Sequence, residues 1–254
     1  MEHHSNQTSW LETIADVVII EPNNKGLINY DHLNHLLDLY KDRNLKIGSF
    51  SAASNVTGIE TDYHLLAKIM HDHGGYCFVD FAASAPYVDI NMHPKDPLEK
   101  LDAIFFSPHK FLGGPGTAGV LIFDSRLYKL RVPDHPGGGT VDWTNPWGEH
   151  KYINDIEARE DGGTPGFLQT IKTALAVKLK EEIGTDKIRE RENELLKKIT
   201  DRYNKQTSPY YAASRLWTDA IIDPLDTRKV ISMGIKAANH APITESYNPG
   251  VIQS

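Results

Sequence analysis

The sequence is poor in cysteine, basic clusters and long apolar runs. Among 254 residues there is one cysteine, Cys77, so the chain cannot form an internal disulfide. No apolar run approaches the ~20 residues of a membrane-spanning helix, and no signal-like segment opens the chain. The net charge of -7 disfavours nucleic acid or an anionic membrane as the main partner. These absences predict a protein of the reducing cytoplasm that acts on a small molecule.

The chain is rich in apolar segments that alternate with helical patterns. It is 40% hydrophobic and long enough to bury one large core or two small ones. Helices are expected at 29–42, with leucines along one face, and from Thr61 to the Gly74-Gly75 pair. Strands are expected at 16–22, 45–54, 76–82, 101–107 and 116–124. Non-alternating apolar strands between helices predict an α/β fold with a mainly parallel sheet flanked by helices.

Polar residues follow three of these strands, where open parallel sheets bind ligands. Asp80 closes one strand and should be buried against a cation or a strong donor, although a structural salt bridge or a turn cap would also explain it. Lys110 follows another strand and precedes Gly113 and Gly114. Burial there would favour the neutral amine, which can form an imine. Such an aspartate and lysine are what pyridoxal 5'-phosphate requires.

Five segments in order along residues 1–195 resemble the class V aminotransferase family. They are "MEHHSNQTSW", "SNVTG", "VDFAAS", "SPHKFLGGPGTAGVL" and "EDGGTPG". This family comprises fold type I pyridoxal-phosphate enzymes, including cysteine desulfurases and selenocysteine lyases. The resemblance implies that residues 1–183 form an incomplete large domain of that fold and that the substrate is an amino acid.

The resemblance also implies a role for individual side chains. Lys110 would bind the cofactor as an imine and act as the catalytic base, and His3 would stack on the ring and carry protons. Asp80 would hold the pyridinium nitrogen. The remaining cofactor contacts would be Asn55 at the phenolic oxygen, Ser107 and His109 at the phosphate, and Thr164 reaching the phosphate from a partner subunit, which implies a homodimer.

Two departures argue against a working cysteine desulfurase. Ala83 stands where desulfurases carry a glutamine that bonds the cofactor oxygen. No cysteine follows Cys77, which lies within a predicted strand and is interpreted as an inert, buried thiol. The upstream phosphate loop is also expected to be absent, because the first residues match the middle of the family's large domain.

The carboxyl-terminal part carries a second resemblance. Residues 184–206 are predicted to form a charged linking helix and residues 207–254 a helical tail. Residues 199–254 are similar to the C-terminus of carboxyltransferase β subunits of the methylcrotonoyl-CoA carboxylase type. One hypothesis is therefore a composite of two gene fragments. The alternative to an enzyme is a non-catalytic composite fragment that lacks the phosphate loop and a substrate-binding arginine.

Twelve histidines and a triglycine invite other interpretations. His71 and His73 lie two positions apart and would diverge on a helix, so solvated histidines are favoured over a metal site. The glycines at 137–139 lack the lysine and hydroxyl of a nucleotide-binding loop. They are interpreted as a mobile connector.

Overall fold

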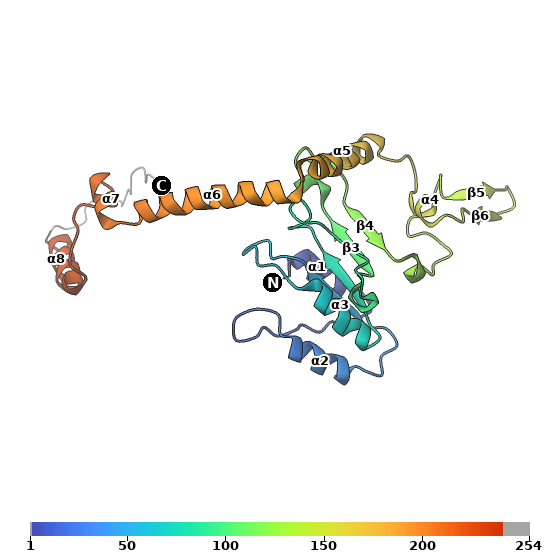
Figure 1. Ribbon diagram of the computed structural model, residues 1–254, viewed down its shortest axis with the longest axis horizontal. Coiled ribbons are helices and arrows are strands. Elements are labelled where there is room, and N and C mark those ends of the chain that lie inside the picture. The colour runs from blue at the N-terminus through green and yellow to red at the C-terminus, as the bar shows by residue number, and fades with distance from the viewer. Residues whose placement is uncertain (1, 241–254) are drawn as a thin grey trace. The chain divides into compact units, whose positions relative to one another are not determined.

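The computed structural model of the protein describes residues 2–240 (Figure 1). The chain divides into two compact units, the first ending at Arg189 and the second beginning at Glu190. In the described part, no helix combines the length and the apolar character needed to cross a bilayer.

A four-stranded sheet forms the centre of the first unit. Its strands are β1 (Ile47–Ser51), β2 (Tyr76–Asp80), β3 (Ala103–Phe106) and β4 (Val120–Phe123), in the order β1-β2-β3-β4. The first three are parallel and β4 runs antiparallel to β3. The mainly parallel α/β fold predicted from the alternating pattern is thus confirmed.

Helix α3 (Tyr63–Asp72) covers the sheet with its apolar face. It packs Leu66 and Met70 into the core, where both are at most 2% exposed. The helix begins two residues after the predicted Thr61, because the Asp62 carboxylate caps it by accepting a hydrogen bond from Leu65 N at 3.1 Å. It ends at Gly74, whose φ of 67° is the left-handed conformation that suits glycine.

Two further helices lie near the amino terminus. The predicted helix at 29–42 is confirmed as α2 (Tyr30–Leu39), with Leu33 and Leu37 buried on one face. The short helix α1 (His4–Leu11) contacts β1. Between them, the strand predicted at 16–22 does not form.

The failure of that strand has a physical reason. A strand needs a neighbour to satisfy its backbone N–H and C=O groups. Within the described residues, the segment forms one strand-like pairing, an isolated bridge between Pro22 and Ile28, and Glu21 N donates to His32 Nδ1. Val17, Val18 and Ile19 are consequently 37%, 43% and 66% exposed.

The rest of the first unit follows β4. It contains the hairpin β5 (Val141–Thr144) and β6 (His150–Tyr152), α4 (Ile156–Glu160) and α5 (Phe167–Ile183). The glycines at 137–139, predicted to be mobile, are tied to the loop before α5, because Gly163 N donates to Gly138 O at 2.8 Å. Thr140, next to them, is fully buried and its hydroxyl donates to Gly137 O at 2.6 Å.

The carboxyl-terminal helices bury little of their side-chain surface. They are α6 (Thr185–Gln206), whose first residues belong to the first unit, α7 (Pro209–Ser214) and α8 (Thr227–Ala238). None of their described side chains is buried. The predicted tail 207–254 extends beyond this description, since residues 241–254 lie outside the described part of the chain.

A buried polar network lies at the amino-terminal end of the parallel strands. Asp102, only 1% exposed, accepts hydrogen bonds from Cys77 N at 2.8 Å and pairs with Lys100 at 2.9 Å. The His71 ring contacts Asp102 Oδ2 at 2.7 Å and Leu98 O at 2.6 Å. The prediction of a solvated His71 is therefore wrong: this histidine ties α3 to the segment that enters β3.

Candidate cofactor site

Asp80 occupies the carboxyl end of a central strand. In the sheet register it lies between Ser51 of β1 and Phe105 of β3. Asp80 is only 7% exposed, as predicted for a carboxylate that ends a buried strand. Its Oδ1 accepts a hydrogen bond from Ala82 N at 2.7 Å, and its Oδ2 makes no hydrogen bond within residues 2–240. One carboxylate oxygen is thus held by the backbone while the other is open to a donor.

Three neighbouring charges act on this carboxyl. Burial raises the pKa of Asp80, and the Ala82 N–H opposes that rise. The Glu2 carboxylate raises the pKa further, whereas the positive charges of Lys110 and His3 lower it. Lys110 and His3 thus lie near enough to Asp80 for their charges to act on its carboxyl, and the roles assigned to the three residues stay predictions.

The amino-terminal segment places His3 beside the sheet. The Glu2 carboxylate accepts hydrogen bonds from Ser51 N at 3.0 Å and Ser51 Oγ at 2.7 Å, which anchors the segment to the end of β1. His3 caps α1, and its Nδ1 accepts from Ser5 N at 3.2 Å. In the neutral ring the proton is then on Nε2.

Glu2 was not among the residues predicted from the sequence. Its only sequence signal was its position immediately before His3. Its contact with Ser51 spans 49 positions of the chain, so periodicity could not reveal it.

A tight turn delivers Lys110 after β3. A 3-10 turn over Pro108–Lys110 is closed by Lys110 N donating to Ser107 O at 3.0 Å. Phe111 is 5% exposed and anchors the turn to the core. A Cβ at Gly114 would lie 1.9 Å from Pro108 O, so the backbone returns across the turn only if this residue is glycine.

The side chains of His109 and Lys110 project from this turn. Both residues are exposed, and Ser107 is half-buried. The expectation that Lys110 would be desolvated is therefore wrong for the described chain, because the residue is exposed. The amine is accessible to a ligand and still lies near enough to Asp80 to affect its charge.

The other predicted contacts lie in loops. Asn55 is exposed on the turn at 54–58, where Ser54 Oγ accepts from Val56 N at 3.3 Å. Ala83 is half-buried in the loop after Asp80. Thr164 is exposed before α5. Within residues 2–240, no hydrogen bond connects Asn55 or Thr164 to His3, Asp80 or Lys110, so their roles stay predictions.

Ser84 is a second residue that the sequence did not single out. It is 6% exposed, and its hydroxyl has no hydrogen-bond partner among the described residues. An unpartnered buried hydroxyl is costly, and this one lies in the loop that follows Asp80.

The single cysteine is unsuited to nucleophilic chemistry. Cys77 is fully buried within β2. Burial, together with the nearby Asp102 charge, raises the pKa of its thiol far above the ordinary value. The prediction of an inert, buried thiol is confirmed.

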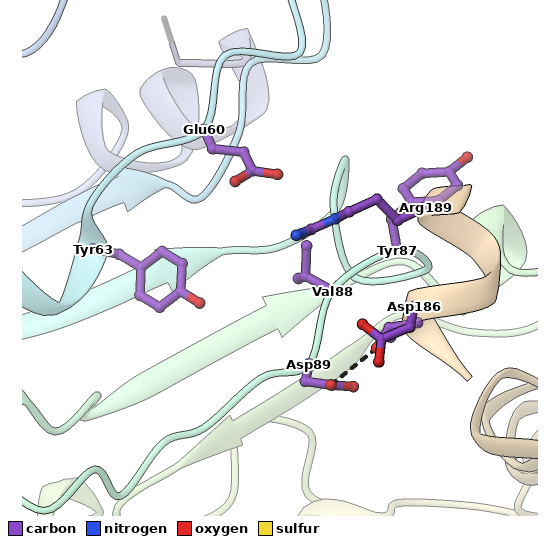
Figure 2. Close-up of a pocket in the computed structure, with 8 residues that line it drawn as sticks. Glu60, Tyr63, Tyr87, Val88, Asp89, Asp186 and Arg189 are labelled. Atoms are coloured by element: carbon purple, nitrogen blue, oxygen red, sulfur yellow. Dashed lines mark hydrogen bonds between the residues drawn. The ribbon is translucent and has the colours of Figure 1, made fainter. Parts of the chain in front are cut away.

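A separate polar pocket of about 300 Å³ lies beside the loop after β2 (Figure 2). Thr185 Oγ1 donates to Asp89 Oδ2 at 3.0 Å at its rim. Tyr63 lies edge-on to Phe81, with ring centroids 5.0 Å apart. None of the predicted cofactor residues contributes to its lining, which consists of Glu60, Tyr63, Tyr87, Val88, Asp89, Thr185, Asp186 and Arg189.

Comparison with known proteins decides the family. Residues 1–214 match the model of the aminotransferase class V family. The chain belongs to this family. The match includes both strand ends that carry Asp80 and Lys110, and it extends into the range expected to resemble a carboxyltransferase.

The relatives of this class V chain are described as probable cysteine desulfurases. One from Pyrococcus abyssi is 28% identical over 220 residues, covering 85% of this chain and 52% of the relative. Another, from Halobacterium salinarum, is 32% identical over 208 residues, covering 80% of this chain and 47% of the relative. The chain thus spans about half the length of the curated relatives it matches.

Solved structures show the same fold. The apo cysteine desulfurase of Thermococcus onnurineus NA1 has a TM-score of 0.67 and 26% identity, covering 82% of this chain and 50% of that one. The cysteine desulfurase CsdA of Escherichia coli has a TM-score of 0.61 and 27% identity, covering 73% of this chain and 45% of that one. The fold type I large domain predicted by resemblance is thereby supported.

Proposed function

We propose that this protein is a pyridoxal 5'-phosphate-dependent enzyme of the class V aminotransferase type, acting on an amino acid, with Lys110 holding the cofactor through a Schiff base. The observation that carries this proposal is the placement of Asp80 and of the Lys110 turn at the carboxyl ends of the adjacent parallel strands β2 and β3. Open parallel sheets bind ligands at this edge.

The Asp80 carboxyl fits the pyridine nitrogen of this cofactor. When bound, pyridoxal phosphate supplies an electron sink for the bonds of the substrate α-carbon. A protonated ring nitrogen needs a buried acceptor, and Asp80 Oδ2 has no other hydrogen bond within residues 2–240. The ion pair would offset the burial that raises the pKa of the Asp80 carboxyl.

Lys110 and His3 supply the proton transfers in this proposal. The exposed Lys110 amine lies on a flexible stem, so its Nζ would be the base that takes up the α-proton of the substrate. His3 Nδ1 accepts the hydrogen bond that caps α1, so Nε2 is the ring nitrogen that can carry a proton. In this proposal it would do so on the side of the cofactor opposite to Lys110.

The remaining contacts complete the proposed site. Ser107 and His109 lie on the turn that carries Lys110 and would bind the phosphate. Asn55 would bind the phenolic oxygen. Ala83 offers no side-chain donor, so it could contribute to the site only by packing. Thr164 would reach the phosphate of a partner subunit in a homodimer.

Sulfur transfer is not part of the proposal. A desulfurase needs a thiolate that reaches the substrate, and the buried Cys77 cannot provide one. The proposal therefore concerns only chemistry at the α-carbon of an amino acid.

The experiment is cofactor capture by Lys110. Purified protein with added pyridoxal phosphate should show a visible absorption band that survives gel filtration, and borohydride should fix the cofactor on the peptide containing residue 110. Lys110→Ala and Lys110→Arg should abolish both signals, because neither can form the imine.

The matched control is Lys129→Ala, which removes an exposed lysine without a described side-chain interaction. It should retain the band and the labelled peptide. A band that persists in Lys110→Ala, or the absence of a band in the unaltered protein, would exclude the proposed chemistry and leave the non-catalytic fragment as the better description.

The resemblance of residues 199–254 to a carboxyltransferase C-terminus remains a hypothesis about origin. Helix α8 occupies Thr227–Ala238, where the sequence predicted a helix, but helicity is compatible with either origin. A continuous natural transcript across codons 180–220 would rule out an assembly artefact.

A further inference from the structure

Helix α5 contacts the loops that follow both Asp80 and Lys110. Three of its side chains, Lys172, Ala176 and Lys180, recur four positions apart and share one face of the helix. Ala176 is 4% exposed and packs into the core cluster. The two lysines flank it, and each donates a hydrogen bond to a backbone carbonyl outside the helix. This face of α5 is thus anchored by amines as well as by apolar packing.

Lys180 contacts both loops at once. Its Nζ donates to Val88 O at 2.5 Å, and the same amine lies 5.9 Å from the centroid of the Phe111 ring, within the range of a cation–π contact. Val88 belongs to the loop after β2, and Phe111 belongs to the turn after β3. One side chain of a third element therefore joins the segments that follow two adjacent strands.

Backbone hydrogen bonds connect Val88 to the strand end that carries Asp80. Val88 N donates to Ser84 O at 3.2 Å, and Ala85 N donates to Phe81 O at 2.8 Å. Phe81 directly follows Asp80 and is fully buried. A displacement of Val88 would therefore be transmitted to Asp80 through a short, internally bonded loop.

Phe111 makes the corresponding connection to Lys110. It directly follows Lys110 and is 5% exposed. Its N–H donates to Pro108 O at 2.9 Å, and its carbonyl accepts from Gly114 N at 2.9 Å. The position of the Phe111 ring thus fixes the turn from which the Lys110 side chain projects.

The surroundings of the Lys180 amine make its contact specific. The residue is half-buried, and burial lowers the pKa of its amine, whereas the Asp89 and Glu181 charges oppose that change. A partly desolvated ammonium needs a good acceptor. Val88 O is its hydrogen-bond acceptor among the described residues.

We propose that Lys180 is a positioning residue of the candidate site, which sets the spacing between Asp80 and Lys110 by fastening both loops to α5. It acts through Val88 and Phe111. The proposal rests on the proposed function only in treating Asp80 and Lys110 as parts of one site. The coupling of the two loops is measurable without cofactor.

The first test is hydrogen exchange of single amides, followed by NMR without cofactor. Lys180→Met keeps a long unbranched side chain but removes the charge and the donor. The amides of Val88 and Phe111 should both exchange about tenfold faster in this variant, because one anchor holds both loops. The amides of α3 should be unchanged, since that helix opens only with the core.

Three further variants separate positioning from a general loss of packing. Lys180→Arg keeps a charged donor and should return both rates close to those of the unaltered protein. Lys172→Met removes the donor to Pro115 O and should loosen the turn after β3 alone. Lys178→Met is the matched control, because Lys178 is an exposed residue of the same helix that pairs with Glu182 at 3.7 Å. It should change neither loop.

A second test uses pyridoxal phosphate. Lys180→Met should need about tenfold more cofactor than the unaltered protein to reach half of the Lys110-dependent absorption band, because the two loops are no longer held at a fixed spacing. Lys180→Arg and Lys178→Met should need about the same amount as the unaltered protein. Absence of a band in the unaltered protein would reject the proposed function, while the exchange rates would still test the coupling of the loops.

Five results would overturn the proposal. They are unchanged exchange in Lys180→Met, faster exchange in one loop only, an equal increase in α3, failure of Lys180→Arg to restore the rates, and loosened loops with unchanged cofactor affinity. Circular dichroism checks that each variant keeps its fold. If Lys180→Met does not fold, Lys180→Gln, which removes the charge but keeps a polar side chain, serves in the same comparison.

Discussion

Asp80 shows how one side chain combines burial with function. Its place at the end of an apolar strand predicts burial, and the structure confirms it at 7% exposure. Burial raises the pKa of its carboxyl, so the protonated form is favoured in the folded protein relative to the unfolded chain. A buried carboxyl with a raised pKa destabilises the folded protein when it ionises, unless a nearby cation offsets the loss of hydration.

The raised pKa of Asp80 predicts how the free energy of unfolding depends on pH in the absence of cofactor. Well below about pH 4, the ordinary pKa of an aspartic acid, Asp80 is protonated in both states. As the pH rises, the unfolded chain ionises first, so the stability contributed by the protonated carboxyl falls and is lost as the pH passes the raised folded pKa. Asp80→Asn keeps an oxygen for Ala82 N and should be the more stable protein at pH 7, but not at pH 3.5.

Urea unfolding of both proteins at the two pH values measures this difference. With pyridoxal phosphate present, the order should change, because the amide cannot neutralise a pyridinium and the variant should bind the cofactor more weakly. Equal free energies of unfolding at pH 7 would contradict the proposed cost of ionising Asp80.

At the scale of elements, the turn after β3 is the best-determined part of the site. The glycines after Lys110 let the backbone turn away closely. Gly113 has a φ of 77°, and a Cβ at Gly114 would lie 1.9 Å from Pro108 O, so both positions favour glycine. The turn positions Lys110 through backbone geometry.

Gly114→Ala should therefore disturb the turn. The added methyl meets backbone and cannot be relieved by a side-chain rotation, so we expect a loss of about 1–3 kcal/mol in the free energy of unfolding. We also expect loss of the Lys110-dependent absorption band. Gly138→Ala, where a Cβ meets nothing within 4 Å, should change stability by less than about 0.5 kcal/mol. Equal effects of the two substitutions in urea unfolding would contradict this account.

At the scale of the whole molecule, stability is distributed unevenly. The core cluster joins α2, α3 and the sheet of the first unit. In contrast, α6, α7 and α8 contribute no buried side chain among those described. Most helical stability in proteins comes from packing an apolar face, so helices without such packing open readily.

Hydrogen exchange should reveal this contrast in the isolated chain. The amides of α8 should exchange at least about 100-fold faster than those of α3, because α3 opens only with the core while α8 opens locally. Mass spectrometry of peptides from the two helices measures both rates in one sample. Comparable protection in α3 and α8 would mean that α8 is packed in solution.

The sequence by itself determined the strands β1 to β4, the helices α2 and α3, and the places of Asp80 and Lys110 at strand ends. These follow from hydrophobic periodicity and from glycine and capping signals, which act over a few residues. The inert Cys77 followed equally from its place within an apolar strand.

Only the tertiary structure decided which segments found partners. Residues 17–19 match a strand pattern but have no neighbouring strand among the described residues, and Lys110 is exposed although Phe111 beside it is buried. His71 contacts Asp102 across 31 positions and Glu2 contacts Ser51 across 49. Burial and hydrogen bonding at such sites depend on segments distant in the chain, and local patterns carry no record of those segments.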